Sequence, residues 1–268
     1  MLGASETPYD LRFRLLGIPV RIHPMFWLAS ALLGWHPHNL GLVVLWIACV
    51  LVSIIVHEFG HALTAKAYRC SPSVVLWGLG GLCYSQIDRH SPRQRLAVIL
   101  AGPGAGFVLF AVVIFVTTLL FRVSPEEHLA AIQSLVGLSH FPWSIEDKFS
   151  EFVGSAAIAR FLTNAYGNLI WINLMWGLVN LLPLWPLDGG QAAQIILTSF
   201  DRSRGPRWGH VLSLLVAGGL AIMVMAISKD MFLVFFFGYF ALINYQVLQT
   251  LHQAHSIGLY QDDDWWRR

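Results

Sequence analysis

Residues 52–68, "VSIIVHEFGHALTAKAY", place two histidines and a glutamate within two helical turns of a stretch that is otherwise apolar. The residues just before it, "GLVVLWIACVL", carry no charge, so the segment starts as a membrane-spanning helix would. An ionisable side chain at the centre of such a helix costs about 3 kcal/mol on insertion scales. His57, Glu58 and His61 therefore need a role that offsets this cost.

The composition is that of a membrane protein. Of 268 residues, 56% are hydrophobic and only 12% are charged, whereas soluble domains carry about 25% charged residues. The net charge of +2 is small, and no basic run is interleaved with aromatic residues. We therefore expect a polytopic protein whose partners include the lipid bilayer but no nucleic acid.

About 20 apolar residues are needed to cross a bilayer as a helix, and six segments suggest such spans. They are residues 24–36, 41–68, 92–121, 157–186, 208–227 and 231–252. The predicted fold class is an all-α polytopic membrane protein with about six transmembrane helices. No repeat or linker divides the sequence, so residues 1–268 are expected to form a single domain.

Two connections between the predicted spans are expected to have structure of their own. Residues 73–88, "SVVLWGLGGLCYSQID", are β-prone with "GLGG" as a turn, which predicts a short membrane-associated β-hairpin between helices two and three. We expect no PDZ domain in this connection and no C-terminal nucleotide-sensing domain after the last span. The connection at 122–155 has room for one amphipathic helix, near "EEHLAAIQSLVG".

The distribution of charge predicts the orientation in the membrane. The connections at 66–95 and 198–207 are rich in Lys and Arg, whereas the connection at 122–155 is acidic. Because basic connections stay in the cytoplasm, both termini are expected there, with residues 122–155 outside. We expect a multi-pass protein of the cell membrane.

The motif "HEFGH" matches H-E-x-x-H. Residues four apart share one face of a helix, so His57 and His61 can bind one metal ion while Glu58 can reach a water on that ion. Zinc suits such a set when a third protein ligand and an open position are present. Chance is the alternative, but the expected number of such matches in this composition is on the order of 1%. The histidines could also simply bond to backbone carbonyls.

A third ligand is available in "NLLPLWPLDGG", residues 180–190. Two prolines end the fourth predicted helix there, and Asp188 follows near the cytoplasmic end. His57 lies roughly 24 Å along the second helix from its outer end, which gives the two sites a similar depth. An aspartate before two glycines is often a turn residue. A turn of that kind would be costly in apolar sequence, so the ligand interpretation is favoured.

These two motifs together resemble those of the site-2 protease family, the intramembrane zinc metalloproteases, and most closely its compact bacterial sporulation-type branch. The resemblance covers nearly the whole chain. It implies one zinc ion per chain, with His57, His61 and Asp188 as ligands and Glu58 as general base. It also implies that Asn180 hydrogen-bonds the substrate carbonyl or its oxyanion.

The residues alone also favour a role for Asn180, because an amide in an apolar helix needs a partner. A hydrogen bond between helices is the alternative, and for Asn173 such packing is preferred.

In the family the predicted hairpin lies beside the active site, which suggests substrate binding at Gly78, Gly80 and Gly81. Gly106 in "AGPGAG" stands where relatives often have a polar residue. The remaining histidines, His128 and His210 among them, are expected at the surface.

The predicted function is an endopeptidase that cleaves transmembrane or juxtamembrane segments of membrane-tethered regulatory proteins near the cytoplasmic face, by attack of a zinc-bound water. The substrate would be presented as an unwound transmembrane segment, because a helix hides its carbonyls. A zinc transporter is one alternative, but transporters need a second set of ligands on a neighbouring helix. An inactive membrane binding protein is another, and loss of Glu58 would favour it.

Overall fold

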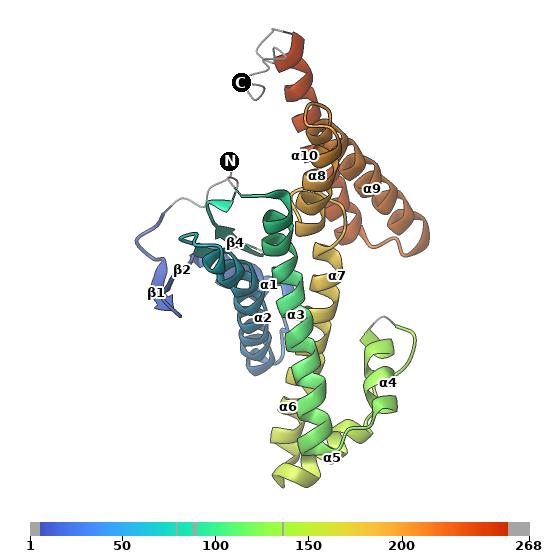
Figure 1. Ribbon diagram of the computed structural model, residues 1–268. Helices are drawn as coiled ribbons and strands as arrows, with labels where there is room; N and C mark the ends of the chain where they lie inside the picture. The colour runs from blue at the N-terminus through green and yellow to red at the C-terminus, as the bar shows by residue number, and fades with distance from the viewer. Residues whose placement is uncertain (1–5, 79, 88–89, 136, 257–268) are drawn as a thin grey trace. The chain divides into compact units, whose positions relative to one another are not determined.

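The computed structural model describes residues 6–78, 80–87, 90–135 and 137–256, with the side chains of 254–256 excepted. The chain divides into two compact units (Figure 1). The first comprises Met1–Arg89 and Ala101–Leu178, and the second comprises His90–Leu100 and Val179–Arg268. The long helix α3, Pro92–Phe121, begins in the second unit and continues in the first.

A four-stranded sheet lies in the first unit. Its strands, in the order β1-β2-β3-β4, are Leu11–Leu15, Ile18–Ile22, Ser73–Trp77 and Gly80–Tyr84. The two hairpins are antiparallel, and β2 pairs with β3 in parallel, with Val20 opposite Val74. Alternate residues of β2 and β3 join an apolar core with α1 and α2, because successive side chains of a strand point to opposite faces.

The predicted hairpin between helices two and three is therefore present as β3 and β4. Strands β1 and β2, which lie before the first predicted span, were not predicted. Their parallel partner β3 brings the start of the chain next to the connection that follows α2. The Lys66 ammonium group donates to the carbonyl of Leu16 at 3.0 Å, which joins the end of α2 to the turn between β1 and β2.

The first predicted span is wrong in length. Helix α1 covers only Pro24–Leu33, about 15 Å, which is half the thickness of a hydrocarbon core. His23 caps it, with its Nδ1 accepting the amide hydrogen of Met25 at 3.1 Å. Helix α2, Leu40–Ala67, is capped by Asn39 and matches the second predicted span.

The rest of the first unit surrounds a second apolar core. It is formed by α3 together with α4 (Pro125–Leu135), α5 (Ser144–Val153) and α6 (Ala156–Trp171). The amphipathic helix predicted near residues 126–137 is α4, and α5 was not predicted. Ser124 and Glu127 start α4 as a capping box, in which each side chain accepts from the other's backbone amide.

His128, expected at the surface, is buried inside this core. Its Nδ1 lies 2.7 Å from the Tyr166 hydroxyl and its Nε2 lies 2.8 Å from the Thr118 hydroxyl. Burial lowers the pKa of the imidazole. The burial of His128 could not be predicted from the amphipathic pattern of α4, because its partners come from two other helices, α3 and α6.

The fourth predicted span is divided. After α6 the chain forms a π-helical turn, Ile172–Trp176, and a short helix α7, Gly177–Asn180. The helical stretch therefore ends six residues before the predicted boundary at 186. Single π-helical turns within α-helices are frequent at functional sites.

The second unit is formed mainly by three helices. They are α8 (Asp188–Phe200), α9 (Gly205–Ile227) and α10 (Met231–Ser256), of which α9 and α10 pack side by side (Figure 1). Residues 228–230, "SKD", make the short connection between α9 and α10. An apolar core of Leu184, Ala217, Phe237 and Phe240 lies between the loop at 181–187 and these two helices.

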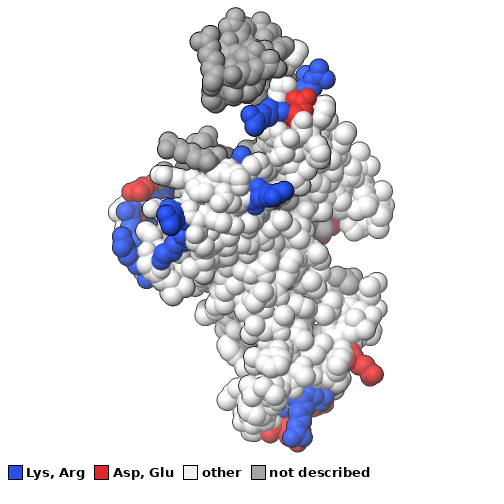
Figure 2. All heavy atoms as spheres, viewed as in Figure 1, with Lys and Arg blue, Asp and Glu red and all other residues white. Residues whose placement is uncertain are grey.

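Four helices of the described chain are long and apolar enough to cross a membrane. They are Leu40–Ala67, Pro92–Phe121, Gly205–Ile227 and Met231–Gln253, and they match four of the six predicted spans. Figure 2 shows a face with few charged side chains, apart from clusters such as the one over β1 and β2, where Arg12, Arg14 and Arg21 lie. The chain is a membrane protein, whereas six transmembrane helices are not confirmed.

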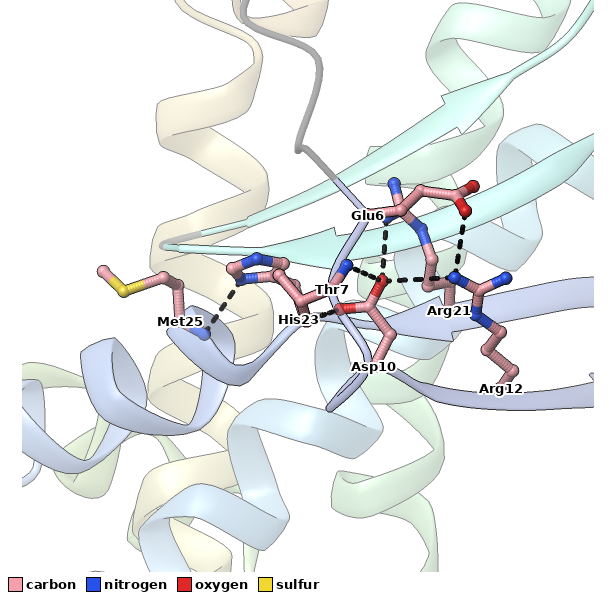
Figure 3. A network of polar contacts seen from close by, with 7 residues as sticks. All are labelled: Glu6, Thr7, Asp10, Arg12, Arg21, His23 and Met25. Atoms are coloured by element: carbon pink, nitrogen blue, oxygen red, sulfur yellow. Dashed lines mark hydrogen bonds and ion pairs between the residues drawn. The ribbon is translucent and has the colours of Figure 1, made fainter.

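The hairpin of β1 and β2 is held by Asp10, whose side chain is fully buried among polar neighbours (Figure 3). Its carboxylate accepts from the Thr7 hydroxyl at 2.6 Å and from the Arg21 guanidinium at 2.9 Å. These two contacts, the Thr7 hydroxyl foremost, lower the pKa of Asp10 to about 2. Arg12 adds a weaker contact at 3.7 Å and also pairs with Glu6.

We predict that Asp10→Asn lowers the Tm of the detergent-solubilised protein at neutral pH. Because the pKa of Asp10 is depressed, its stabilisation is full above the ordinary value near 3.8 and is lost as the pH falls through about 2. The difference in Tm between the two proteins should therefore shrink over that range. Glu6→Gln is the control, since Glu6 is 71% exposed and should matter little. Equal Tm values for both variants at pH 7 would contradict this account.

Candidate metal centre

The three side chains of the H-E-x-x-H motif lie on the buried face of α2. His57 is 5% exposed, Glu58 4% and His61 7%. The face continues toward the helix N-terminus through Ser53 and Val50, at the spacing of three and four residues that a helix requires. A helix thus delivers two imidazoles and one carboxylate to one buried place.

The geometry of the two imidazoles fits one shared zinc ion. The Nε2 atoms of His57 and His61 lie 3.2 Å apart, with ring centroids at 4.9 Å. Two nitrogens bound to a tetrahedral zinc at its usual bond length are separated by about 3.3 Å. An N–H···N hydrogen bond between the rings would have a similar length, so a binding measurement decides between them.

Two glycines make room for these side chains. A Cβ on Gly102 of α3 would overlap the His61 ring, and a Cβ on Gly81 of β4 would overlap the Glu58 carboxylate. The bare backbone at Gly102 therefore lets α3 approach α2 closely. The contact of Gly81 places the hairpin beside Glu58.

Asn173 links the π-helical turn to the same face of α2. Its amide donates to the hydroxyl of Ser53, one turn before His57, at 2.9 Å and to the Leu169 carbonyl at 2.8 Å. The predicted packing role of Asn173 is confirmed. A Cβ on Gly106 would lie 3.7 Å from the Asn173 oxygen, so Gly106 contributes no polar group of its own there.

Asp188 belongs to the second unit and opens helix α8. Residues 181–187 lie before it as turns, in agreement with the predicted break at the two prolines, whereas the new helix that starts at Asp188 was not predicted. Asp188 is 9% exposed, and a carboxylate in the first turn is stabilised by the helix dipole. The next two glycines are required by packing, since a Cβ on Gly189 or Gly190 would overlap the backbone of residues 181–185.

Asn180 ends α7 in the second unit and is 7% exposed. Of the two alternatives open to this amide, a hydrogen bond between helices is not seen within the described part of the chain.

Two buried imidazoles four residues apart on a helix, with a carboxylate beside them, form the H-E-x-x-H arrangement of zinc-dependent hydrolases, in which the histidines bind the metal. The family model of Peptidase family M50 matches residues 45–226, more than half of the chain. The chain therefore belongs to peptidase family M50. This region contains the H-E-x-x-H motif, Asn180 and Asp188.

Three curated relatives agree with this family. The Synechocystis protein sll0528, named as a zinc metalloprotease, is 26% identical over 85% of this chain and 54% of its own length. Zinc metalloprotease MJ0392 of Methanocaldococcus jannaschii is 24% identical over 79% and 50%. Stage IV sporulation protein FB of Bacillus subtilis is 25% identical over 65% and 46%. The chain spans about half the length of these relatives.

A solved structure has a similar fold. The site-2 protease from Methanocaldococcus jannaschii aligns with a TM-score of 0.53 at 21% identity, over 90% of this chain and 95% of that one. At this identity the likeness concerns the fold alone. The predicted resemblance is therefore confirmed at the level of the family, peptidase family M50, and of the fold.

We predict that Gly102→Ala lowers the zinc content of the purified protein, because the added methyl group displaces the His61 ring. Gly104→Ala is the matched control on α3, since a Cβ there meets nothing within 4 Å. Zinc would be measured by elemental analysis of wild type and both variants, after thermal unfolding has shown that the three proteins are equally stable. Full zinc in Gly102→Ala would mean that His61 holds no metal in this position.

Proposed function

We propose that the chain is an intramembrane zinc endopeptidase that cleaves transmembrane or juxtamembrane segments of membrane-tethered regulatory proteins near the cytoplasmic face. The single observation that carries the proposal is the convergence of His57 and His61, with Glu58 beside them, on the buried face of a helix long enough to span a membrane. Membership of a peptidase family supports it.

Zinc would be held by His57, His61 and Asp188, a group in which each residue offers one ligand atom. Two imidazoles and a carboxylate are a common catalytic set, and they leave a fourth position open. The bound metal would lower the pKa of a water and polarise the scissile carbonyl. The names of the curated relatives agree with the choice of zinc.

The proposed role of Glu58 is to take a proton from the attacking water and later deliver it to the leaving amine. Its position next to His57, buried against Gly81, keeps the carboxylate close to the predicted metal and shields it from bulk water. Asn180 would donate a hydrogen bond to the oxygen on which charge develops, a contribution of about 3 kcal/mol for a well-placed donor.

Substrate would bind along β4. Among the described strands β4 is an edge strand, paired only with β3. An unwound substrate segment could add to this edge through backbone hydrogen bonds, with little demand on side chains. Gly78 in the turn, and Gly80 and Gly81 at the start of β4, would let the two backbones approach closely. A Cβ added at Gly81 would overlap Glu58, so this end of β4 lies beside the proposed general base, which supports this placement.

We predict that Glu58→Gln keeps zinc and fold but cuts cleavage by roughly 10²–10⁴-fold, the usual contribution of a positioned general base. Glutamine has the size of glutamate but cannot accept the proton. The assay is zinc content together with cleavage of transmembrane model peptides that carry weak helix formers near one end. Glu126→Gln, an exposed position, is the control. A Glu58→Gln protein that holds zinc and cleaves at the normal rate would remove this mechanism.

The proposed orientation places both termini and the connection after α2 in the cytoplasm of a bacterium. The Lys and Arg content of that connection supports it. The parallel pairing of β2 with β3 adds support, because it puts the start of the chain and residues 73–77 at the same end of α2. The helices α4 and α5 would then lie outside.

Cysteine labelling of intact cells tests this orientation. In a protein lacking Cys49, Cys70 and Cys83, which are all free thiols, a membrane-impermeant maleimide should label Leu138→Cys, since Leu138 is 77% exposed. Ser91→Cys should react only after the membrane is permeabilised. Labelling of Ser91→Cys alone in intact cells would reverse the orientation and move the cleavage site to the outer face.

A further inference from the structure

The loop at residues 181–187, which leads to Asp188, is held by two buried side chains from other helices. The Trp185 amide donates to the hydroxyl of Ser213 on α9 at 2.9 Å, and the Trp185 carbonyl accepts from the amide of Asn244 on α10 at 2.8 Å. Ser213 is 1% exposed and Asn244 is fully buried. Irregular backbone in apolar surroundings must find partners of this kind.

The hydrogen bonds of Asn244 form a directed chain. Its Nδ2 donates to the carbonyls of Trp185 and Phe240, so its Oδ1 is the acceptor that faces His210 Nδ1 at 2.8 Å. His210 must then carry its hydrogen on Nδ1, which leaves Nε2 to accept from Gln194 of α8 at 3.5 Å. His210, expected at the surface, is instead 5% exposed within this chain.

The loop packs directly against the first turn of α8, so its position determines the position of that turn. The backbone nitrogen of Trp185 lies so close to Gly190 that a Cβ there would overlap it, and residues 181 and 182 crowd Gly189 in the same way. The Gln191 side chain also donates to the Pro186 carbonyl at 3.0 Å. A displacement of Trp185 would therefore displace the turn that begins with Asp188.

We propose that Ser213 and Asn244 are positioning residues for the third metal ligand: they fix the backbone of Trp185, and through it the carboxylate of Asp188. The proposal rests on the assignment of Asp188 as a zinc ligand in the proposed function. It also explains why an amide and a hydroxyl stand at fully buried places of two apolar helices, where unpaired polar groups are unfavourable.

The experiment measures the zinc dissociation constant of the purified full chain by competition with a chelator. The variants are Asn244→Leu, which keeps the side-chain size but removes its hydrogen bonds, Ser213→Ala and Asp188→Ala. Each of the first two is also combined with Asp188→Ala. Ser199→Ala is the matched control, because among the described residues the Ser199 hydroxyl bonds only to the carbonyl one turn back on α8. Thermal unfolding of each metal-free variant is recorded in parallel.

We expect Asn244→Leu and Ser213→Ala each to weaken zinc binding roughly 10–100-fold, the usual effect of removing a residue that orients a metal ligand. In the Asp188→Ala background the same changes should have little further effect, because the ligand they orient is gone. Ser199→Ala should bind zinc as wild type does. If these residues served helix packing alone, their variants would unfold at a lower temperature, and their effect on zinc affinity would not depend on the presence of Asp188.

Three outcomes overturn the inference. Normal zinc affinity in both Asn244→Leu and Ser213→Ala, with weakened binding in Asp188→Ala, would refute the positioning role and leave the ligand assignment standing. Equal losses with and without Asp188 would also refute it. Normal affinity in Asp188→Ala would refute the ligand assignment itself. If Asn244→Leu does not fold, Ser213→Ala alone decides among these outcomes.

Discussion

The constraint on which the first unit depends is the burial of two imidazoles and a carboxylate on one face of α2. Such groups are unfavourable in apolar surroundings unless each is partnered. The neighbouring elements leave space for these groups. Helix α3 approaches α2 with Gly102, where a larger side chain would collide with His61, and β4 approaches with Gly81, where one would collide with Glu58. The 3.2 Å between the imidazole nitrogens follows from the four-residue spacing of the motif.

The features that the sequence predicted well are those set by neighbouring residues. The spacing of His57 and His61 fixes their common face once the helix forms, and hydropathy over about 20 residues identifies a span. Helices α2, α3, α9 and α10 were found in this way. The hairpin of β3 and β4 was also predicted, since its β-prone residues surround a glycine-rich turn.

The features that it missed depend on contacts between distant residues or on competing signals. "LRFRL" at residues 11–15 alternates as a strand does, but the sheet that it joins depends on the pairing of Val20 with Val74, which are far apart in the sequence. Helix α8 begins where two prolines signalled only an end. His128 and His210 are buried by partners from other helices, and no local pattern around either residue predicts those partners.

Three asparagines of the apolar helices show how partners distinguish packing from function. An unpaired amide in an apolar environment costs about 1–3 kcal/mol on the scale of protein mutations. Asn173 donates to Ser53 and Asn244 donates to Trp185, so each amide is satisfied by another part of its own unit. Asn180 is 7% exposed and has no such partner within the described residues. Asn180 and Asp188 belong to one sequence motif, so this amide lies on the segment that carries the proposed third ligand, in agreement with its proposed role in substrate binding.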